Sequence, residues 1–527
     1  MPEEHRPEDP GAADAPRIVG RARRHGTRTA AVATEGTFTY EDLLRASERV
    51  ARTLLGDRDD LDEDRVAFLV PPGFQYVAVQ WGIWRAGGIA VPMAVSHPPR
   101  ELAYVLEDAD PVAVVVHPSM AKRIPDVRGL PVWSSEALTA APPGASPGEI
   151  VSSAPARDLP RVVASRRAMM LYTSGTTGRP KGVVTTHANI EAQVRSLVEA
   201  WGWTQEDHIL LILPLHHVHG IVNVLSCALW SGARCTILPG FDAGETWREI
   251  ARGDLTLFMA VPTIYARLLA AWEQASPDQR EAWSAGCRRM RLMVSGSAAL
   301  PVSMLERWRD VSGHTLLERY GMTEIGMVLS NPLEGERRPG FVGHPLPGVQ
   351  VRLVGEDGRP VAEGEPGEVV VRGDTVFSEY WRCPEETASA FPDGWFRTGD
   401  IAVVEDGAHR ILGRSSVDII KTGGYKVSAL EIEEVLRTHP AVADCAVVGV
   451  PDAEWGERVA AALVPAHGEN VPEADILRPW LKERLAPYKV PSLFLASAEL
   501  PRNAMGKVTK PAIRELFGDG KHGGEPS

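Results

Sequence analysis

Short apolar runs alternate with longer amphipathic segments through the first part of the chain. "VAFLV" (66–70), "IAVPM" (89–93) and "VAVVV" (112–116) have the length and composition of buried strands. Residues 74–88 and 100–110 lie between these runs and carry helical patterns. Buried strands joined by helices form parallel sheets, because a parallel strand pair needs a crossover connection. The pattern therefore predicts an α/β fold with mainly parallel sheets.

A Gly-rich loop follows a further predicted strand at 168–173. The segment "YTSGTTGRPKG" (172–182) begins inside that strand, and the Pro-, Ser- and Ala-rich stretch 141–161 before it reads as a linker or surface loop. A loop that cradles phosphates needs glycines, hydroxyl donors and a cation. The segment offers all three, in Gly175, Gly178, Gly182, Thr173, Ser174, Thr176, Thr177 and Lys181.

This loop does not follow the Walker phosphate-loop pattern. Counting from Gly175, Pro180 stands where that pattern requires Gly, and Gly182 stands where Ser or Thr should follow Lys181. A surface loop is the plain alternative. The donors at the end of a buried strand favour a nucleotide-phosphate site of a different type.

The chain changes character near residues 413–428, where a Gly pair and polar side chains precede a new helix. Ser428 and Glu431 have the spacing of a capping box at the start of that helix. Residues 441–450, 472–485 and 490–496 then complete a predicted α+β unit of about 110 residues, an ordinary domain size.

Length and charge limit the function classes. A chain of 527 residues is expected to form two or more domains. The formal net charge of −13 argues against a nucleic-acid partner or an anionic membrane surface, since both attract basic proteins. No run of about 18 apolar residues occurs, so no membrane span is expected.

Cysteines and the N-terminal segment favour a reducing compartment. The five cysteines form no CxxC pair and fit neither a disulfide framework nor a zinc site: Cys227, Cys235, Cys287, Cys383 and Cys445. Residues 1–16 are acidic and Pro-rich, predicted to be disordered, and have the pattern of neither a secretory signal nor a transit peptide. The sequence predicts a cytoplasmic protein.

Six further stretches accompany the Gly-rich loop in a fixed order. They are "PLHHVHG" (214–220), "SGSAALP" (295–301), "ERYGMTE" (318–324), "GWFRTGD" (394–400), "GRSSVDIIKTGGYKVSALE" (413–431) and "PRNAMGK" (501–507). This ordered set resembles the adenylate-forming superfamily, which includes acyl-CoA synthetases, luciferases and peptide-synthetase adenylation domains. "FMAVPTIYARL" (258–268) and "HTLLERYGMTEIGM" (314–327) look closest to malonyl-CoA synthetases of the type called acyl-CoA synthetase family member 3.

The resemblance implies a large AMP-binding domain at 17–414, a hinge at 415–417 and a small mobile C-terminal domain at 418–515, with a disordered tail at 516–527. It also implies two half-reactions. A carboxylate attacks the α-phosphorus of ATP to give acyl-AMP and pyrophosphate, and the thiol of CoA then attacks the acyl carbonyl and expels AMP. The small domain rotates between the two steps.

Residue roles follow from the matched motifs. Lys507 resembles the adenylation lysine, Glu324 the Mg²⁺ ligand, and Thr323 an α-phosphate contact. Asp400 and Arg414 look like ribose contacts, with an exposed ion pair as the plain alternative. Asp400 is expected on a Thr-Gly turn at a strand end. The remaining ATP contacts implied are the loop residues above together with Gly296, Ser297, Ala298, Tyr320 and Gly321.

The residues expected to act in the transfer to CoA match the family pattern less closely. The hinge position is Ser416, where family members usually carry Asp or Lys; Ser can still absorb a large change in backbone angles. Gly423, Gly424 and Lys426 are expected to line the pantetheine channel. His217 resembles the gate between the acyl pocket and that channel. A metal site at His216, His217 and His219 is a rival interpretation, disfavoured because no acidic residue or Cys lies nearby in the sequence.

Arg319 bears on the identity of the acid. A buried arginine is costly without a carboxylate partner, and a second carboxylate on the substrate would supply one. An internal partner, Glu318 or Glu324, is the alternative. Ser297 narrows the same pocket and favours a short acid.

The sequence therefore favours an ATP-dependent acid–thiol ligase that converts malonate, with methylmalonate as a variant, to its CoA thioester. A medium- or long-chain acyl-CoA ligase, a ligase that loads a carrier protein, and a degenerate nucleotide-binding protein remain alternatives. The expected partners are Mg²⁺, ATP, CoA and a small acid, and the protein is expected to be a monomer or homodimer.

Overall fold

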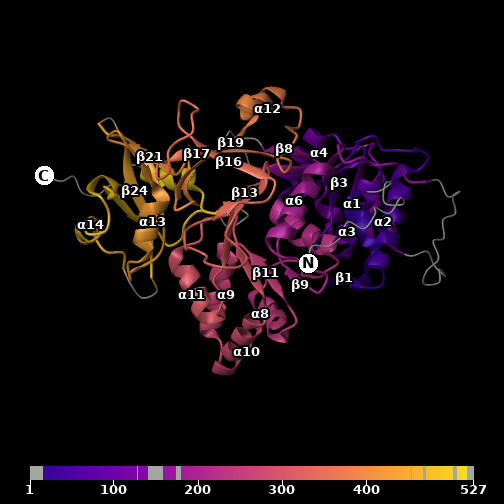
Figure 1. Ribbon diagram of the computed structural model, residues 1–527, viewed down its shortest axis with the longest axis horizontal. Helices are drawn as coiled ribbons and strands as arrows, with labels where there is room; N and C mark the ends of the chain where they lie inside the picture. Colours follow the sequence, from indigo (N-terminus) through magenta and orange to yellow (C-terminus); the bar gives the residue numbers. More distant parts are fainter. Residues whose placement is uncertain are drawn as a thin grey trace.

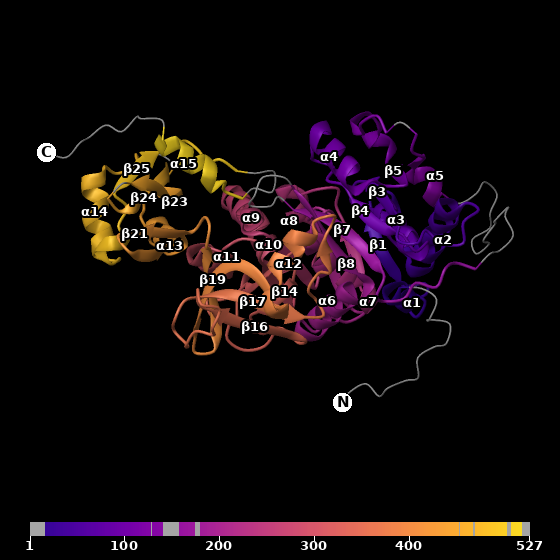
Figure 2. The ribbon, with the colours of Figure 1, turned by 90° about the horizontal axis from the view of Figure 1, so that it is seen from above.

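The computed structural model describes residues 16–127, 129–140, 158–173, 180–452, 454–466, 470–502 and 507–518. Two large sheets and a smaller antiparallel sheet make up the first four-fifths of the chain, and a separate α+β unit follows at the opposite end from β3 and β5 (Figures 1 and 2). The predicted architecture is confirmed: a large domain with mainly parallel sheets and a small C-terminal domain.

The first large sheet carries the loop singled out in the sequence. Its strand order is β18-β8-β7-β4-β3-β5-β6. The strands from β7 to β6 run parallel, whereas β8 and β18 are antiparallel to their neighbours. The bounds are β3 Arg65–Leu69, β4 Ile89–Pro92, β5 Ala113–Val116, β6 Val132–Ser134, β7 Arg167–Thr173, β8 Lys181–Thr186 and β18 Glu379–Tyr380.

The second large sheet has nine strands in the order β15-β14-β13-β12-β11-β9-β10-β1-β2. Its centre, from β13 to β1, is parallel, and its edges are antiparallel. The bounds are β1 Thr29–Ala33, β2 Gly36–Thr39, β9 His208–Leu211, β10 Arg234–Ile237, β11 Leu257–Ala260, β12 Leu292–Ser295, β13 Leu317–Met322, β14 Gly326–Ser330 and β15 His344–Pro345.

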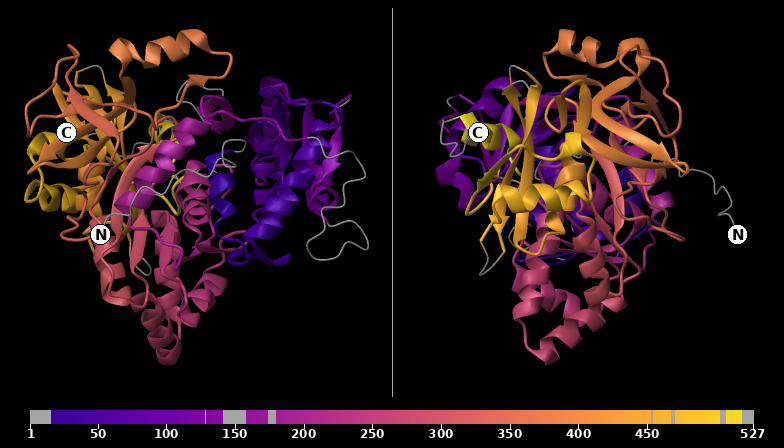
Figure 3. Two further views of the ribbon diagram at one scale, coloured as in Figure 1. Left: turned by 45° about the vertical axis from the view of Figure 1, so that its right-hand side comes forward. Right: turned by 90° about the vertical axis from the view of Figure 1, so that its left-hand side faces the viewer.

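Most of the helices that cover these sheets share one apolar core with both of them, and a second core lies on the other face of the first sheet. The group α8 to α11 projects beyond the sheets, which is clear in the turned views (Figures 1 and 3). The helices of the large domain are α1 Arg17–Ala22, α2 Tyr40–Leu55, α3 Phe74–Arg85, α4 Pro99–Ala109, α5 Ser135–Thr139, α6 His187–Ala200, α7 Cys227–Ser231, α8 Ala243–Arg252, α9 Pro262–Gln274, α10 Pro277–Arg288, α11 Val302–Ser312 and α12 Pro384–Ala390, with the π-helical segment η3 His219–Ser226.

A four-stranded antiparallel sheet leads towards the small domain. Its order is β16-β17-β19-β20, with bounds Val349–Val354, Gly367–Gly373, Phe396–Glu405 and Ala408–Arg414. Asp400, expected on a turn at a strand end, lies instead inside β19, where it pairs in register with Arg414. Gly399 beside it takes φ 73°, a conformation that favours glycine.

The C-terminal unit has a core of its own, built around Ile432, Val447 and Leu477. Its strands are β21 Ile419–Thr422, β22 Tyr425–Ser428, β23 Val442–Asp452, β24 Gly456–Pro465 and β25 Leu493–Ala496, and its helices are α13 Ala429–Arg437, α14 Ala474–Lys482 and α15 Lys510–Gly518. Separate cores allow two units to move relative to one another.

Two details of this unit differ from the sequence predictions. Only half of the capping box forms: Ser428 Oγ accepts from the amide of Glu431 at 3.3 Å, but the Glu431 carboxylate binds Lys489 Nζ at 2.6 and 2.8 Å. Helix α15 extends three residues into the range predicted to be a disordered tail, because Phe517 is buried in the core.

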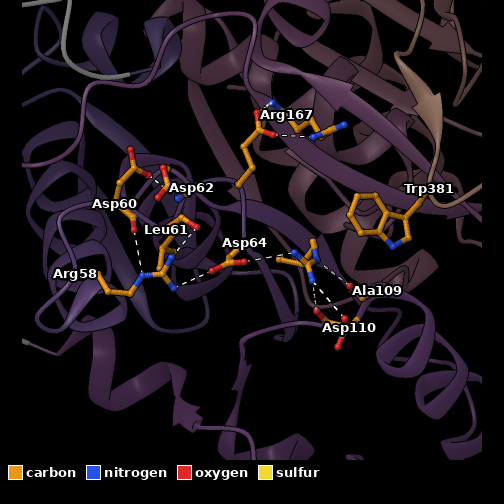
Figure 4. A network of polar contacts seen from close by, with 12 residues as sticks. Arg58, Asp60, Leu61, Asp62, Asp64, Ala109, Asp110, Arg167 and Trp381 are labelled. Atoms are coloured by element: carbon orange, nitrogen blue, oxygen red, sulfur yellow. Dashed lines mark hydrogen bonds and ion pairs between the residues drawn. The ribbon is translucent and has the colours of Figure 1, made fainter.

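A polar network surrounds the start of β3 in the first sheet (Figure 4). Arg65 Nε donates to the carbonyl of Ala109 at 2.9 Å, and Nη2 donates to that of Asp110 at 2.6 Å. The Arg65 guanidinium also lies 5.2 Å from the ring centre of Trp381, which follows β18. These contacts tie β3, the end of α4 and β18 together. Among the described residues, no helix is long and apolar enough to cross a membrane.

Candidate active site

The Gly-rich loop connects two paired strands. Thr173 at the end of β7 pairs with Lys181 at the start of β8, so both side chains stand at the base of the loop. Five of the predicted loop contacts lie outside the described residues: Ser174, Gly175, Thr176, Thr177 and Gly178. Their roles stay predictions.

Helix α4 anchors both ends of this loop. Tyr172 Oη donates to Asp108 at 2.6 Å on the side of β7, and Tyr104 Oη donates to the carbonyl of Pro180 at 2.6 Å on the side of β8. Tyr104 and Asp108 lie outside the motif, so the motif alone did not reveal this anchor. Helical spacing puts Tyr104 and Asp108 on one face of α4, which was the signal available.

Glu324 lies in the turn between β13 and β14, and its side chain is linked to the base of the loop. Tyr380 Oη donates to Glu324 Oε1 at 3.2 Å, and the ammonium of Lys181 lies 5.3 Å from the Tyr380 ring centre. Burial raises the pKa of the Glu324 carboxyl. Tyr380 thus joins two predicted ATP contacts that are far apart in the sequence. The sequence analysis did not single it out.

Both carboxylate oxygens of Asp400 accept hydrogen bonds from neighbouring side chains. Arg414 Nε donates to Oδ1 at 2.9 Å, and Tyr320 Oη donates to Oδ2 at 2.5 Å. Arg414 also donates to the carbonyl of Thr398 at 3.1 Å. Since the Asp400 side chain is 13% exposed, this is a half-buried assembly and not the exposed ion pair that was the alternative. The structure therefore gathers Tyr320, Asp400 and Arg414 as predicted.

Arg319 on β13 is a buried cation with few partners. Its Nη2 donates to Ser297 Oγ at 3.4 Å, while Nε and Nη1 have no hydrogen-bond partner in the described part of the chain. A Cβ on Gly296 would come within 2.6 Å of the Arg319 Cζ, so a side chain at position 296 would displace the guanidinium. Burial lowers the pKa of Arg319 to about 9.

The internal-partner alternative for Arg319 is wrong. Glu318 accepts a hydrogen bond from the amide of Gly340 at 3.1 Å, and Glu324 is held by Tyr380. Leaving a buried guanidinium half satisfied costs free energy, and such groups deserve an explanation. Arg319 therefore has donor capacity for a ligand.

One histidine of the "PLHHVHG" segment, His219, lies close to this arginine. His219, at the start of η3, places Nδ1 3.3 Å from Ser297 Oγ, so His219 rather than His217 touches the predicted acyl contact. Burial, together with Lys507 and His97, lowers the pKa of His217 to about 4, and burial and Arg319 also lower the pKa of His219 well below its usual value. Both rings are neutral at pH 7. The described residues hold no group of three His, Cys, Asp or Glu able to bind a metal.

Lys507 from the C-terminal unit reaches the same region. Burial and the charges of Arg319 and Arg414 lower the pKa of its ammonium, while Asp400 opposes this shift. These influences place Lys507 among the predicted acyl and ribose contacts. Residues on seven distant parts of the chain are thereby brought into one site.

Two stretches of the chain match known protein families. Residues 19–381 match the AMP-binding enzyme family, and residues 431–507 match the AMP-binding enzyme C-terminal domain. The chain belongs to the AMP-binding enzyme family.

Similar proteins cover this AMP-binding enzyme almost completely. The mitochondrial malonate–CoA ligase ACSF3 of Xenopus laevis is 46% identical, over 95% of this chain and 92% of its own, and the Homo sapiens protein of the same name is 45% identical over 95% and 92%. Among solved structures, ATP-bound MatB from Rhodopseudomonas palustris is 35% identical with a TM-score of 0.84, over 95% and 99% of the two chains.

A second solved structure differs more in overall arrangement. The ternary product complex of a malonyl-CoA ligase with methylmalonyl-CoA and AMP is 36% identical and covers 91% of this chain and 97% of its own, yet its TM-score is 0.63.

The predicted CoA contacts of this AMP-binding enzyme lie on the small domain. Gly423 and Gly424 form a two-residue turn between β21 and β22, with φ of 53° and 82°, which glycine adopts without strain. Lys426 Nζ forms an ion pair with Glu356 of the large domain at 2.6 Å. These residues therefore do not join the cluster around Lys507 in this structure.

The hinge position of the enzyme lies in a tight turn. Ser416 is exposed, and the amide of Asp418 donates to the carbonyl of Arg414 at 2.7 Å. Asp418 Oδ2 accepts from the amide of Arg414 at 2.9 Å, while Oδ1 pairs with Lys510 Nζ at 2.6 Å. Few contacts hold Ser416 itself, so the prediction that it is the pivot stays open to test.

Proposed function

We propose that this enzyme converts malonate, ATP and CoA to malonyl-CoA, AMP and pyrophosphate. The observation that carries the choice of acid is the buried, half-satisfied guanidinium of Arg319 beside Ser297 and His219. The malonate–CoA ligase names of the relatives, at up to 47% identity, support the same substrate.

The charge and the unpaired donors of Arg319 favour a substrate with a second carboxylate. A pKa of about 9 leaves the guanidinium mainly charged at pH 7. Nε and Nη1 can donate to the carboxylate that does not react, and this desolvated pair is far stronger than an exposed one. An apolar acid leaves both donors unpaired and binds less well.

The first half-reaction uses the cations gathered around the phosphates. One malonate carboxylate attacks the α-phosphorus, the bond to pyrophosphate breaks, and acyl-AMP remains. Lys507 lies between the acyl and nucleotide contacts and can neutralise the charge that develops on the α-phosphate. Lys181 and the loop hold the departing pyrophosphate, Thr323, Gly296, Ala298 and Gly321 line the nucleotide, and Asp400 with Arg414 and Tyr320 binds the ribose.

Magnesium fits the donors available. Mg²⁺ is usually held by one or two carboxylates together with substrate phosphates and waters. The buried carboxylate of Glu324, close to Tyr380 and on the Lys181 side of the site, can serve as that ligand. When bound, the ion neutralises charge on the phosphates.

The second half-reaction transfers the acyl group. The CoA thiol attacks the acyl carbonyl, AMP leaves, and the thiol proton passes to solvent. We propose that Gly423, Gly424 and Lys426 approach the site for this step by a rotation about Ser416, and that neutral His217 lines the route of the thiol.

A pyrophosphate-release panel tests the function. Malonate, methylmalonate, acetate and octanoate are compared with and without CoA. We expect malonate to give the highest kcat/KM, and CoA-dependent formation of its thioester. Faster turnover of octanoate than of malonate would favour a medium- or long-chain ligase. Acyl-AMP formation without transfer to CoA would favour loading of a carrier protein. ATP binding without turnover of any acid would favour a degenerate nucleotide-binding protein.

Location and assembly stay proposals. The sequence favours a cytoplasmic monomer or homodimer, whereas the vertebrate relatives are named mitochondrial. Fractionation of cells that produce the full chain, and light scattering of the purified protein, decide these two points.

A further inference from the structure

Helix α11 lacks a cap of its own at its N-terminus. Pro301 precedes the helix, makes no side-chain cap, and the first turn contains no acidic residue. The first amides of a helix have no partner inside the helix, so they must find one elsewhere. Here the amide of Val302 donates to Glu434 Oε2 at 3.2 Å. Glu434 lies on α13, so the small domain supplies this cap to the large domain (Figures 1 and 2).

The Glu434 carboxylate is held ready for this contact. Arg437, one turn further along α13, donates to Glu434 Oε1 at 3.3 Å. Glu318 of the large domain is near enough to interact with Glu434, but its pKa of about 8, raised mainly by burial, keeps it mostly protonated at pH 7. A carboxylate at a helix N-terminus is also favoured by the helix dipole.

The capped amide directly follows the loop that carries the candidate acyl contacts. Residues 295–301 lead from β12 to α11, and Gly296 and Ser297 within them lie against Arg319. Ser297 has φ 70°, a conformation that a residue with a side chain adopts at a cost. Docking of α13 on α11 therefore holds one end of a strained substrate loop.

When α13 is docked on α11, Lys507 of the same domain lies near the candidate acyl and ribose contacts. Both Glu434 and Lys507 belong to the small domain, and in this structure Lys507 lies within reach of Arg319 and Arg414. Another contact between the domains, Lys426 with Glu356, joins side chains that are 58% and 83% exposed. Exposed ion pairs contribute little, so the half-buried Glu434 contact is the better candidate for holding this arrangement.

We propose that Glu434 is a positioning residue for acyl-AMP formation: by capping α11 it stabilises the domain arrangement in which Lys507 and the loop 295–301 face one substrate. The proposal rests on the proposed ligase function. It assigns Glu434 no direct contact with a substrate. The contact must break when the small domain rotates for transfer to CoA, so Glu434 favours the first half-reaction alone.

The kinetic test separates the two half-reactions in three variants. Glu434→Ala removes the acceptor, Glu434→Gln keeps an oxygen that can accept from Val302, and Glu356→Gln breaks the exposed pair as a matched control. We expect Glu434→Ala to slow pyrophosphate release with malonate by about five- to tenfold, the effect of a lost helix cap, and to leave thioester formation from prepared malonyl-AMP unchanged or faster. Glu434→Gln should retain most of the first rate, and Glu356→Gln both rates.

A distance measurement tests the same proposal without any acid. Asp406 of the large domain and Asp475 of α14 each have a side chain that is 93% exposed, and both can be replaced by Cys for spin labels in a Cys383→Ser background, since the other four cysteines are buried. With Mg²⁺ and ATP, Glu434→Ala should broaden or shift the distance distribution relative to the parent and to Glu434→Gln.

The outcomes are distinct. Equal loss of both half-reactions, or an unchanged distance distribution in Glu434→Ala, overturns the role of Glu434. If the parent enzyme releases no pyrophosphate with malonate, the proposed substrate fails, and the distance measurement still decides whether Glu434 holds the domain arrangement.

Discussion

Arg319 donates a long 3.4 Å hydrogen bond to Ser297, and that serine oxygen lies 3.3 Å from His219. The three side chains come from β13, from the loop after β12 and from η3. A buried cation, a hydroxyl and a neutral imidazole thus converge on one place. Each can bind a carboxylate oxygen, which supports the proposed selection of a second carboxylate over an apolar chain.

Replacing Arg319 by Ala should cost malonate far more than acetate or butyrate. Loss of a desolvated charge partner typically costs about 2–5 kcal/mol, or more than about 30-fold in kcat/KM. Steady-state pyrophosphate release measures this for each acid. Arg248→Ala, an arginine 68% exposed on α8, is the control and should leave every value unchanged. An equal loss for all acids would identify Arg319 as structural.

Ser297 offers a matched pair of variants. Ser297→Ala and Ser297→Gly both remove the hydroxyl, so both should lower kcat/KM for malonate by about three- to tenfold, the effect of one neutral hydrogen bond. Gly also widens the pocket and suits φ 70°, so Ser297→Gly should use butyrate better than Ser297→Ala does. The ratio of butyrate to malonate turnover checks this, and equal ratios in the two variants would remove Ser297 from the pocket wall.

Lys507→Ala should abolish acyl-AMP formation and spare the second half-reaction. In the proposed mechanism the ammonium serves the α-phosphate in the first step and moves away with the small domain for the second. Exchange of labelled pyrophosphate into ATP measures the first step, and thioester formation from prepared malonyl-AMP measures the second. Lys482→Ala, on α14 of the same domain, is the control. Similar losses in both steps would contradict the assigned role.

We expect the buried Glu318 carboxyl to make the stability of the folded protein depend on pH. Burial raises the pKa of its carboxyl from 4.5 to about 8 in the folded protein, so the folded state holds a proton that the unfolded state has lost between these values. Stability from this group is therefore full at low pH and decreases as the pH rises from about 4.5 to 8.

In Glu318→Gln the group is neutral at every pH, and its oxygen can still accept from Gly340. The melting temperature of the variant should match that of the parent near pH 5 and exceed it near pH 9. Differential scanning at the two pH values gives the comparison. A difference independent of pH would show that Glu318 does not titrate in this range.

The ordered motifs predicted many of the residues of the candidate site. Glu324, Asp400, Arg414 and Lys507 were each predicted from a short local pattern, and the structure brings all four to one region. The buried strands and the helices between them were also predicted well, because apolar periodicity reflects which face of an element is covered. Asp400 was misplaced on a turn because a bulge at Gly399 looks the same in sequence as a strand end.

Contacts between distant segments were out of reach. Tyr380 contacts both Lys181 and Glu324 although it lies 56 positions after Glu324 in the sequence. Nothing in the local pattern around Tyr380 indicates this role. Glu434 resembles any partly exposed helix residue until α11 is seen to lack a cap. Similarly, the sequence of the segment does not distinguish His217 from His219. Only the folded structure shows that His219, at the start of η3, contacts Ser297.

The sequence by itself determined the α/β class, because the periodicity of its elements reflects which faces are buried. The resemblance of its ordered motifs to the adenylate-forming superfamily implied the chemistry and the residues proposed to carry it. The tertiary structure alone decided that Arg319 has no internal carboxylate, that His219 faces Ser297, and that the small domain caps α11. Such facts depend on which side chains meet after folding, and burial and partnership are properties of pairs that no single stretch of sequence contains.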